Sequence, residues 1–316
     1  MLMDEYLLKR MVSSVIAITG VSLLTFLLLF VLPGDPAEML AIAKYGPRDA
    51  TQAAIDHLIR QEGLDQPVVL QYARWLKGVL GGDMGISRIS GKPVWQEINV
   101  RLPATLYLAG TSLVISLCVG LPLGIVAALQ RGTCWDHLAT GTSLIGVAIP
   151  NFWLGLILIL VFGLYLGWLP TFGYGTLPHL VLPAATVGIS MAGITARLTR
   201  SAVIDVLGQA YIKTARAKGL PGHVILGRHV IKNALIPIIT IAGIQLGHLL
   251  EGTVIIEMVF AWPGIGRLLI EAVHNRDVSQ IQGCVLYIAI VFCLVNVFID
   301  LLYTRLDPRV RLNDRD

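Results

Sequence analysis

The side chains best suited to chemistry in an apolar setting are a histidine and a glutamate in one long hydrophobic run. His248 and Glu251 lie within residues 235–258 and are three residues apart, so both can face the same side of a helix. Polar groups inside a membrane span are functional candidates by default, and this pair could receive a cationic or metal-bearing substrate. Alternatively, the pair contacts polar groups of a neighbouring membrane subunit. Gln245 and Asn296 are secondary candidates for a substrate pathway.

The sequence gives no support for enzymatic chemistry. No Ser/His/Asp arrangement or H-E-x-x-H motif suggests catalysis. Residues 85–92 combine glycines with a lysine, but the spacing is not that of a P-loop and Pro93 follows the lysine. The cysteines form no C-x-x-C or Cys/His cluster and are interpreted as free; they are Cys118, Cys134, Cys284 and Cys293. We therefore expect no catalytic residue, no metal site and no cofactor bound by this chain.

A basic and polar stretch interrupts the hydrophobic sequence between residues 197 and 233. Its apolar residues can form one face of a short helix, and basic residues surround that face. The apolar positions are Tyr211, Ile212, Ala215, Leu220, Val224 and Ile225, and the basic positions are Lys213, Arg216, Lys218 and Arg228. The pattern is compatible with a helix lying on anionic lipid and with a helix docked in a groove of a soluble partner. Composition alone leaves both interpretations open.

Six long hydrophobic runs must position these side chains. The chain is 55% hydrophobic and 14% charged, with a mean hydropathy of +0.73, whereas soluble domains carry about 25% charged residues. A helix of about 20 apolar residues crosses a bilayer core, so the sequence predicts an all-α membrane protein and disfavours a large soluble α/β domain. We expect spans near 11–32, 104–129, 139–166, 178–198, 235–258 and 281–303, with a short outer loop around residues 167–175.

Lysine and arginine residues gather at one set of span ends, which marks the cytoplasmic side. They occur at Lys9 and Arg10, at Arg131, throughout residues 197–233 and in the C-terminal tail. Both termini are therefore expected in the cytoplasm. The first apolar run is too long for a signal peptide and lacks an Ala-x-Ala site, so it is interpreted as a retained helix. Membrane orientation also explains the net charge of +4 without nucleic acid as a partner.

Several features of the loops and spans predict local structure. Residues 33–103 are expected to form a small outer cap with helices near 51–60 and 71–80. The Gly-x-x-x-Gly pairs at 120–124 and 243–247 predict close helix contacts, and Pro122 and Pro150 predict kinks. The Phe260–Arg267 segment is expected to form an outer turn with Trp262 as an interfacial anchor, and Glu257 just before it is expected to pair with a neighbouring subunit.

The basic stretch resembles the "EAA" loop of ATP-binding-cassette importer permeases, in the peptide/nickel branch. There the loop reads Y-x-x-T-A-R-A-K-G followed by H-x-x-x-N-A-x-x-P. The matching residues here are Tyr211, Thr214, Ala215, Arg216, Ala217, Lys218, Gly219, His229, Asn233, Ala234 and Pro237. Lys213 stands where many importers have the acid of the motif, so no role is assigned to an acid. Further similar segments are 32–36, 63–67, 102–106, 260–267 and 307–309, which extends the resemblance over nearly the whole chain.

Within this branch the resemblance points to two substrate classes. Residues 150–154, 168–170 and 173–175 look most similar to nickel-permease subunits, whereas 214–220 look similar to di- and oligopeptide or glutathione permeases. The resemblance implies a subunit that imports peptides or nickel chelates by alternating access. A stand-alone secondary transporter or channel is the alternative, and the scarcity of buried charges disfavours it.

The resemblance also implies a fold, partners and site residues. The expected fold is the six-helix type I importer permease, divided into 1–32, an outer loop 33–103 and a core 104–316 with a cytoplasmic coupling loop 199–234. The expected partners are a homologous second permease, two cytoplasmic ATPase subunits that use ATP and Mg²⁺, a periplasmic or lipid-anchored substrate-binding protein, and lipid of a bacterial inner membrane. The coupling residues would be Tyr211, Thr214, Ala215, Arg216, Ala217, Lys218, Gly219 and Leu220.

Overall fold

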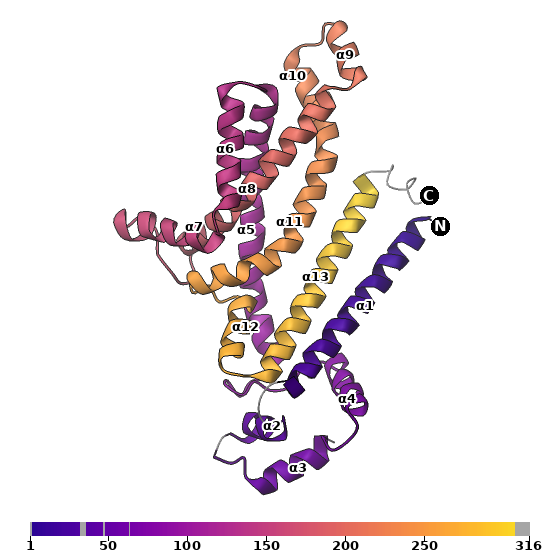
Figure 1. The fold of residues 1–316 in the computed structure, drawn as a ribbon, viewed down its shortest axis with the longest axis vertical. Helices are drawn as coiled ribbons and strands as arrows, with labels where there is room; N and C mark the ends of the chain where they lie inside the picture. The colour runs from indigo at the N-terminus through magenta and orange to yellow at the C-terminus, as the bar shows by residue number, and fades with distance from the viewer. Residues whose placement is uncertain (1, 32–35, 47, 63, 307–316) are drawn as a thin grey trace. The chain divides into compact units, whose positions relative to one another are not determined.

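The computed structural model describes all residues except 1, 32–35, 47, 63 and 307–316. The described residues form helices and one isolated β-bridge, between Ile86 and Pro93. The helices, labelled in Figure 1, are α1 Leu2–Val31, α2 Pro36–Tyr45, α3 Gln52–Glu62, α4 Val68–Leu80, α5 Val94–Leu129, α6 Cys134–Ala148, α7 Asn151–Leu158, the π-helix η1 Ile159–Tyr165, α8 Leu177–Leu207, α9 Ala210–Ala217, α10 Gly222–Val224, the π-helix η2 Ile225–Ile231, α11 Lys232–Val259, α12 Ile265–His274 and α13 Val278–Leu306. The motif at 307–309 and most of the one at 32–36 lie outside the described residues.

Four helical segments of the described chain are long and apolar enough to cross a membrane. They are Leu8–Leu27, Val94–Leu129, Leu177–Leu207 and Val278–Ile299. A fifth is obtained when Gly222–Leu235 and Pro237–Gly247, which are bent by 44° at Pro237, are taken as one span. These segments confirm the all-α membrane architecture and four of the six predicted spans, those near 11–32, 104–129, 178–198 and 281–303. The bent pair overlaps the predicted span 235–258 only in part.

The predicted third span, 139–166, differs from the expectation because Pro150 ends a helix instead of bending it. α6 stops at Ala148, and α7 with η1 forms a separate apolar helix, Asn151–Tyr165. A residue before proline avoids the helical region and proline itself lacks an N–H donor. Pro150 instead becomes the N-cap of α7, where its carbonyl accepts from the amides of Trp153 and Leu154 at 3.0 and 3.1 Å. In contrast, α5 continues through Pro122 without interruption.

The chain divides into two compact units. The first unit comprises residues 1–3, 106–262 and 295–316. Within it α8 is central, because it packs against α6, α7 and α11. α9 and α10 lie beyond the ends of α8 and α11, as Figure 1 shows.

Close contact between α5 and α8 depends on glycines. A Cβ atom on Gly120 would lie 2.6 Å from Thr195 Cβ, and one on Gly124 would lie 2.5 Å from the Ala196 carbonyl oxygen. From the opposite helix, a Cβ on Gly188 would lie 2.7 Å from Ile115 Cβ. No real Cβ atom tolerates such distances, so the predicted close approach at 120–124 is confirmed.

The second unit comprises residues 4–105 and 263–294. The predicted helices near 51–60 and 71–80 are present as α3 and α4, and α2 precedes them. α2 and α3 share a small apolar core, while α4 places Tyr72 and Trp75 against Phe26 of α1. The Tyr72 hydroxyl also hydrogen-bonds Ser22 at 2.6 Å. The segment after α1 is therefore a folded part of this unit.

Candidate functional site

The α9 helix is attached to the first unit by its apolar underside. Ile212 is fully buried and Ala215 is 7% exposed. Both belong to one apolar cluster with residues from the ends of α5 and α8, from η2 and from the start of α11. The other buried members are Ala128, Ala202, Val203, Ile225, Val230, Ala234 and Ile238. This cluster ties α9 to three long helices.

The end of α9 is set by Gly219. Its φ is +76°, a left-handed conformation that glycine adopts at little cost. The amide of Leu220 donates to the Ala215 carbonyl at 3.3 Å, and the amide of Gly219 donates to the Arg216 carbonyl at 2.9 Å. These two bonds form a Schellman motif, which closes the helix and turns the chain away.

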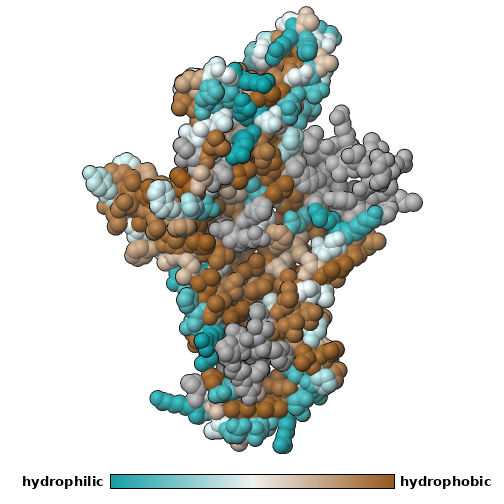
Figure 2. All heavy atoms as spheres, viewed as in Figure 1, coloured by the Kyte–Doolittle hydropathy of each residue, from teal (hydrophilic) through white to brown (hydrophobic). Residues whose placement is uncertain are grey.

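The opposite side of α9 and the turn after it are exposed. Arg216, Lys218 and Lys213 are all exposed there, and Tyr211 retains 43% of its accessible surface. Figure 2 shows hydrophilic residues gathered over this end. Of the eight predicted coupling residues, seven are exposed and only Ala215 faces inward. The predicted apolar face needs a correction, because Tyr211 and Leu220 are exposed whereas Ile212, Ala215 and Ile225 are buried.

The second half of the motif, which follows this turn, contributes to the packing of the first unit. Ala234 is fully buried in the same apolar cluster, and the Asn233 side-chain amide donates to the His229 carbonyl at 2.6 Å. That bond supports the backbone where the π-helix η2 passes into α11. The second half of the motif therefore stabilises the start of α11 and the apolar cluster to which α9 is attached.

An ion pair that the sequence reasoning missed lies next to this site. Arg200 of α8 donates to both carboxylate oxygens of Asp136, at 2.7 and 2.8 Å. Asp136 is buried, and it also accepts from the Gly132 amide at 3.0 Å in the turn between α5 and α6. The hydrogen bonds from Arg200, and then that from Gly132, hold the pKa of Asp136 well below its ordinary value. The pair fixes the α5–α6 turn to α8 two helical turns before α8 ends.

We predict that Asp136→Asn lowers the thermal stability of the chain, since Arg200 loses its two-point acceptor. A carboxylate with a depressed pKa stabilises the fold above its ordinary pKa, and this contribution is lost only as the pH falls toward the folded-state value. The loss should therefore be the same at mildly acidic and mildly basic pH in a detergent melting experiment. Arg200→Lys should fall between the wild type and Asp136→Asn. A loss confined to basic pH would contradict this account.

The candidate residues of the substrate pathway differ in their burial and contacts. Gln245 is buried among α5, α8 and α11, where its side-chain oxygen lies 3.3 Å from the Ser116 hydroxyl and 3.2 Å from the Thr195 hydroxyl. Asn296 is partly buried in α13. His248 and Glu251 belong to α11, but their side chains lie outside the described residues. Among the described residues, no group of three or more His, Cys, Asp or Glu side chains could hold a metal ion.

The turn after α11 packs inside the protein. Trp262 is only 2% exposed and meets Tyr174 edge-to-face, with ring centroids 4.8 Å apart. The Gly173 amide donates to the Phe260 carbonyl at 3.0 Å, and Ala261 has a φ of +51°. The expected interfacial role of Trp262 is therefore wrong, because the 173–175 loop covers its ring. Glu257 is also fully buried within the chain.

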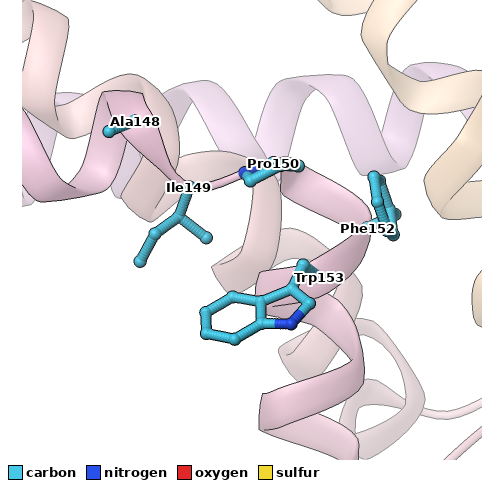
Figure 3. A pocket seen from close by; sticks show the side chains of 5 residues that line it. All are labelled: Ala148, Ile149, Pro150, Phe152 and Trp153. Atoms are coloured by element: carbon cyan, nitrogen blue, oxygen red, sulfur yellow. The ribbon is translucent and has the colours of Figure 1, made fainter.

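An open apolar pocket of about 480 Å³ lies where α6 meets α7. It is lined by Ala148, Ile149, Pro150, Phe152 and Trp153. Figure 3 shows the Ile149 and Trp153 side chains on the same side of the break at Pro150. None of these five side chains carries a charge.

Comparison with known proteins agrees with this architecture. The family described as "Binding-protein-dependent transport system inner membrane component" matches residues 120–312, and the N-terminal family of such membrane components matches 3–109. The glutathione transport system permease protein GsiC of Salmonella paratyphi A is 41% identical over 98% of this chain and 99% of its own length. GsiC of Escherichia coli is 40% identical with the same coverage.

Solved structures support the fold. An inward-facing MetNI methionine ABC transporter matches with a TM-score of 0.59 and 17% identity, covering 67% of this chain and 97% of that one. An amino acid ABC transporter crystallised with histidines matches with a TM-score of 0.54 and 15% identity, covering 66% and 94%. With an anchored basic helix beyond a bundle of apolar helices, and with family matches over almost its full length, this chain belongs to the inner-membrane permease components of binding-protein-dependent ABC importers.

Proposed function

We propose that this permease imports small peptides of the glutathione class. The observation that carries the proposal is the 40–41% identity to glutathione permeases over 98% of the chain. Residues 214–220, which resemble peptide and glutathione permeases, are exposed except for Ala215. The chain itself supplies a path and a docking surface, while ATP and Mg²⁺ are used by partner subunits.

The proposed mechanism assigns α9 the role of a coupling helix. Two cytoplasmic ATPases close on ATP, and each holds a helix of this kind in a surface cleft. The exposed Arg216 and Lys218 meet acidic groups there, while the buried Ile212 carries the motion into the bundle. With a homologous second permease, rocking between two packed states exposes the pathway alternately to each side. A substrate-binding protein delivers the peptide from outside, and both termini lie in the cytoplasm.

The substrate is tested with the whole complex in proteoliposomes. Glutathione, a dipeptide and a nickel–histidine chelate are offered in parallel with the binding protein present, and uptake and ATP hydrolysis are measured. We expect glutathione to stimulate both. Stimulation by nickel alone would reject the peptide proposal and would make His248 and Glu251 the first pathway residues to replace. Transport that persists after inactivation of the partner ATP sites would instead support a stand-alone transporter.

A further inference from the structure

Helix α4 packs on the part of α1 that forms a membrane span. The rings of Tyr72 and Trp75 meet the ring of Phe26, with centroids 5.4 and 5.7 Å apart. The Tyr72 hydroxyl lies 2.6 Å from the Ser22 hydroxyl, and Ser22 and Phe26 both belong to the first apolar span. Ser22 precedes Val31, the last residue of α1, by nine residues, which is about 14 Å along a helix. Tyr72 and Trp75 are therefore level with the last turns of a membrane helix, and Figure 1 shows α4 next to this end of α1.

The aromatic residues of α4 are of the kind that occupies the edge of a bilayer. Tyr72 and Trp75 stack with ring centroids 6.1 Å apart, and both are partly buried. Tryptophan and tyrosine are enriched where hydrocarbon meets the headgroups, because the ring is apolar and its polar atom still needs a partner. Ser22, which is only 2% exposed, supplies that partner for Tyr72. α4 is thus attached to α1 by contacts that suit an apolar environment.

One edge of α4 presents a row of apolar side chains. This apolar stripe, defined as Val69, Ala73, Leu76 and Leu80, follows the i, i+4, i+7, i+11 spacing of one edge of a helix. Val69 retains 76% of its accessible surface and Leu80 retains 81%, whereas Ala73 is exposed and Leu76 is half-buried. Lys77, on the next edge, is exposed. Single exposed apolar side chains need no explanation, but a row of them marks a contact with a membrane or a protein.

Lipid fits the apolar stripe better than a protein partner does. An apolar edge beside a basic residue is typical of a helix in the bilayer interface, with its apolar side about 5–10 Å into the boundary between headgroups and acyl chains. α1, on which α4 rests, exposes Leu24 at 66% and Leu27 at 37% in the same turns. Protein interfaces are usually anchored by aromatic residues or arginine, whereas the aromatic residues of α4 are already used against α1. Short aliphatic side chains are left on the stripe, and acyl chains need nothing more.

We propose that α4 is an interfacial helix, with the apolar stripe among the acyl chains at the edge of the bilayer and Lys77 extended toward the lipid phosphates. A lysine can do this because its aliphatic stem lies along apolar surface while its ammonium group reaches the headgroups. The depth of α4 follows from its contacts with α1, so it is the same whichever side of the membrane the second unit faces. The segment between α1 and α5 is then anchored to the bilayer by a helix that does not cross it.

The test measures the depth of single residues in the complete transporter in nanodiscs. The accessible cysteines of the complex are first replaced by serine; in this chain they are Cys118, Cys134 and Cys293, while the fully buried Cys284 is kept. One new cysteine at a time then carries an environment-sensitive fluorophore. The phosphatidylcholine of the nanodisc bears a nitroxide near the carbonyl end of an acyl chain, and this group quenches only fluorophores that lie close to that depth.

Val69→Cys and Leu80→Cys place the fluorophore on the apolar stripe. The matched control is Gln52→Cys, at an exposed polar position at the start of α3 in the same unit. We expect quenching to be several-fold stronger at both stripe positions than at the control, together with a shift of their emission to shorter wavelength. Lys77→Cys should fall between them, because its side chain is directed toward the headgroups.

Two outcomes would overturn the proposal. One is quenching at Val69→Cys and Leu80→Cys that is no stronger than at Gln52→Cys. The other is strong quenching in the isolated permease that disappears in the complete transporter, because a partner subunit would then cover the stripe. No substrate is present in this experiment, so a failure of glutathione to be transported would leave its result unchanged.

Discussion

Replacing Gly124 with leucine is expected to separate α5 from α8 and to prevent stable folding of the permease. Even a methyl group at this position would lie 2.5 Å from the Ala196 carbonyl oxygen and 2.6 Å from Thr199 Cβ. The first of these is backbone, so no rotamer change relieves the conflict. Overpacking a buried site commonly costs about 1–3 kcal/mol, and a leucine against backbone should exceed that. The measurement is the yield of monodisperse protein in detergent and its melting temperature.

The same helix offers a matched control. Gly110 also lies in α5, and a Cβ atom built on it meets nothing within 4 Å. Gly110→Leu should therefore leave the yield and the melting temperature near those of the wild type. Gly124→Ala should fall between the two, since a methyl group demands a smaller separation of the helices. Equal loss in Gly110→Leu would mean that the effect comes from the bilayer or from insertion, and not from the α5–α8 contact.

The features that the sequence predicted well are those that local periodicity determines. A Gly-x-x-x-Gly pair allows close packing where another helix approaches, and α8 does approach Gly120 and Gly124. The long apolar runs predicted the major helices because a span of about 20 residues has few alternatives. The exposed positions of Arg216 and Lys218 could be predicted because lysine and arginine are almost never fully buried unless they are paired.

The features that it missed depend on contacts between distant residues. Asp136 and Arg200 are 64 residues apart, and each looked like an ordinary charge at a span end. Trp262 seemed suited to a membrane interface until Tyr174, far away in sequence, was found beside it. At Pro150 the sequence predicted a kink, whereas the helix ends there and α7 begins as a separate helix that packs against α8. Ala215 could face either way, because its small side chain suits both a docking surface and a core.

Reversing the charge of the exposed end of α9 is expected to abolish ATP-driven transport while leaving the permease folded. In Arg216→Glu/Lys218→Glu both side chains are exposed, so stability should change by no more than about 0.5 kcal/mol. Like charges placed opposite one another across an interface cost roughly several kcal/mol, so the ATPases should no longer be held. The measurements are substrate-stimulated ATP hydrolysis and uptake by the assembled complex, beside the melting temperature of the isolated permease.

Two further variants separate docking from folding at this end. Arg131→Glu/Lys232→Glu makes the same change in net charge at exposed positions outside α9, and it should retain most of the transport activity. Gly219→Asn introduces a residue that tolerates positive φ. Apart from Gly219 and its two chain neighbours, no atom of the described residues lies within 4 Å of a Cβ atom built at that position. Its folding should therefore be close to normal. If Gly219→Asn nevertheless loses transport, the obstruction must come from a partner packed against Gly219. Full transport in Arg216→Glu/Lys218→Glu, by contrast, would contradict a role for α9 in the coupling mechanism.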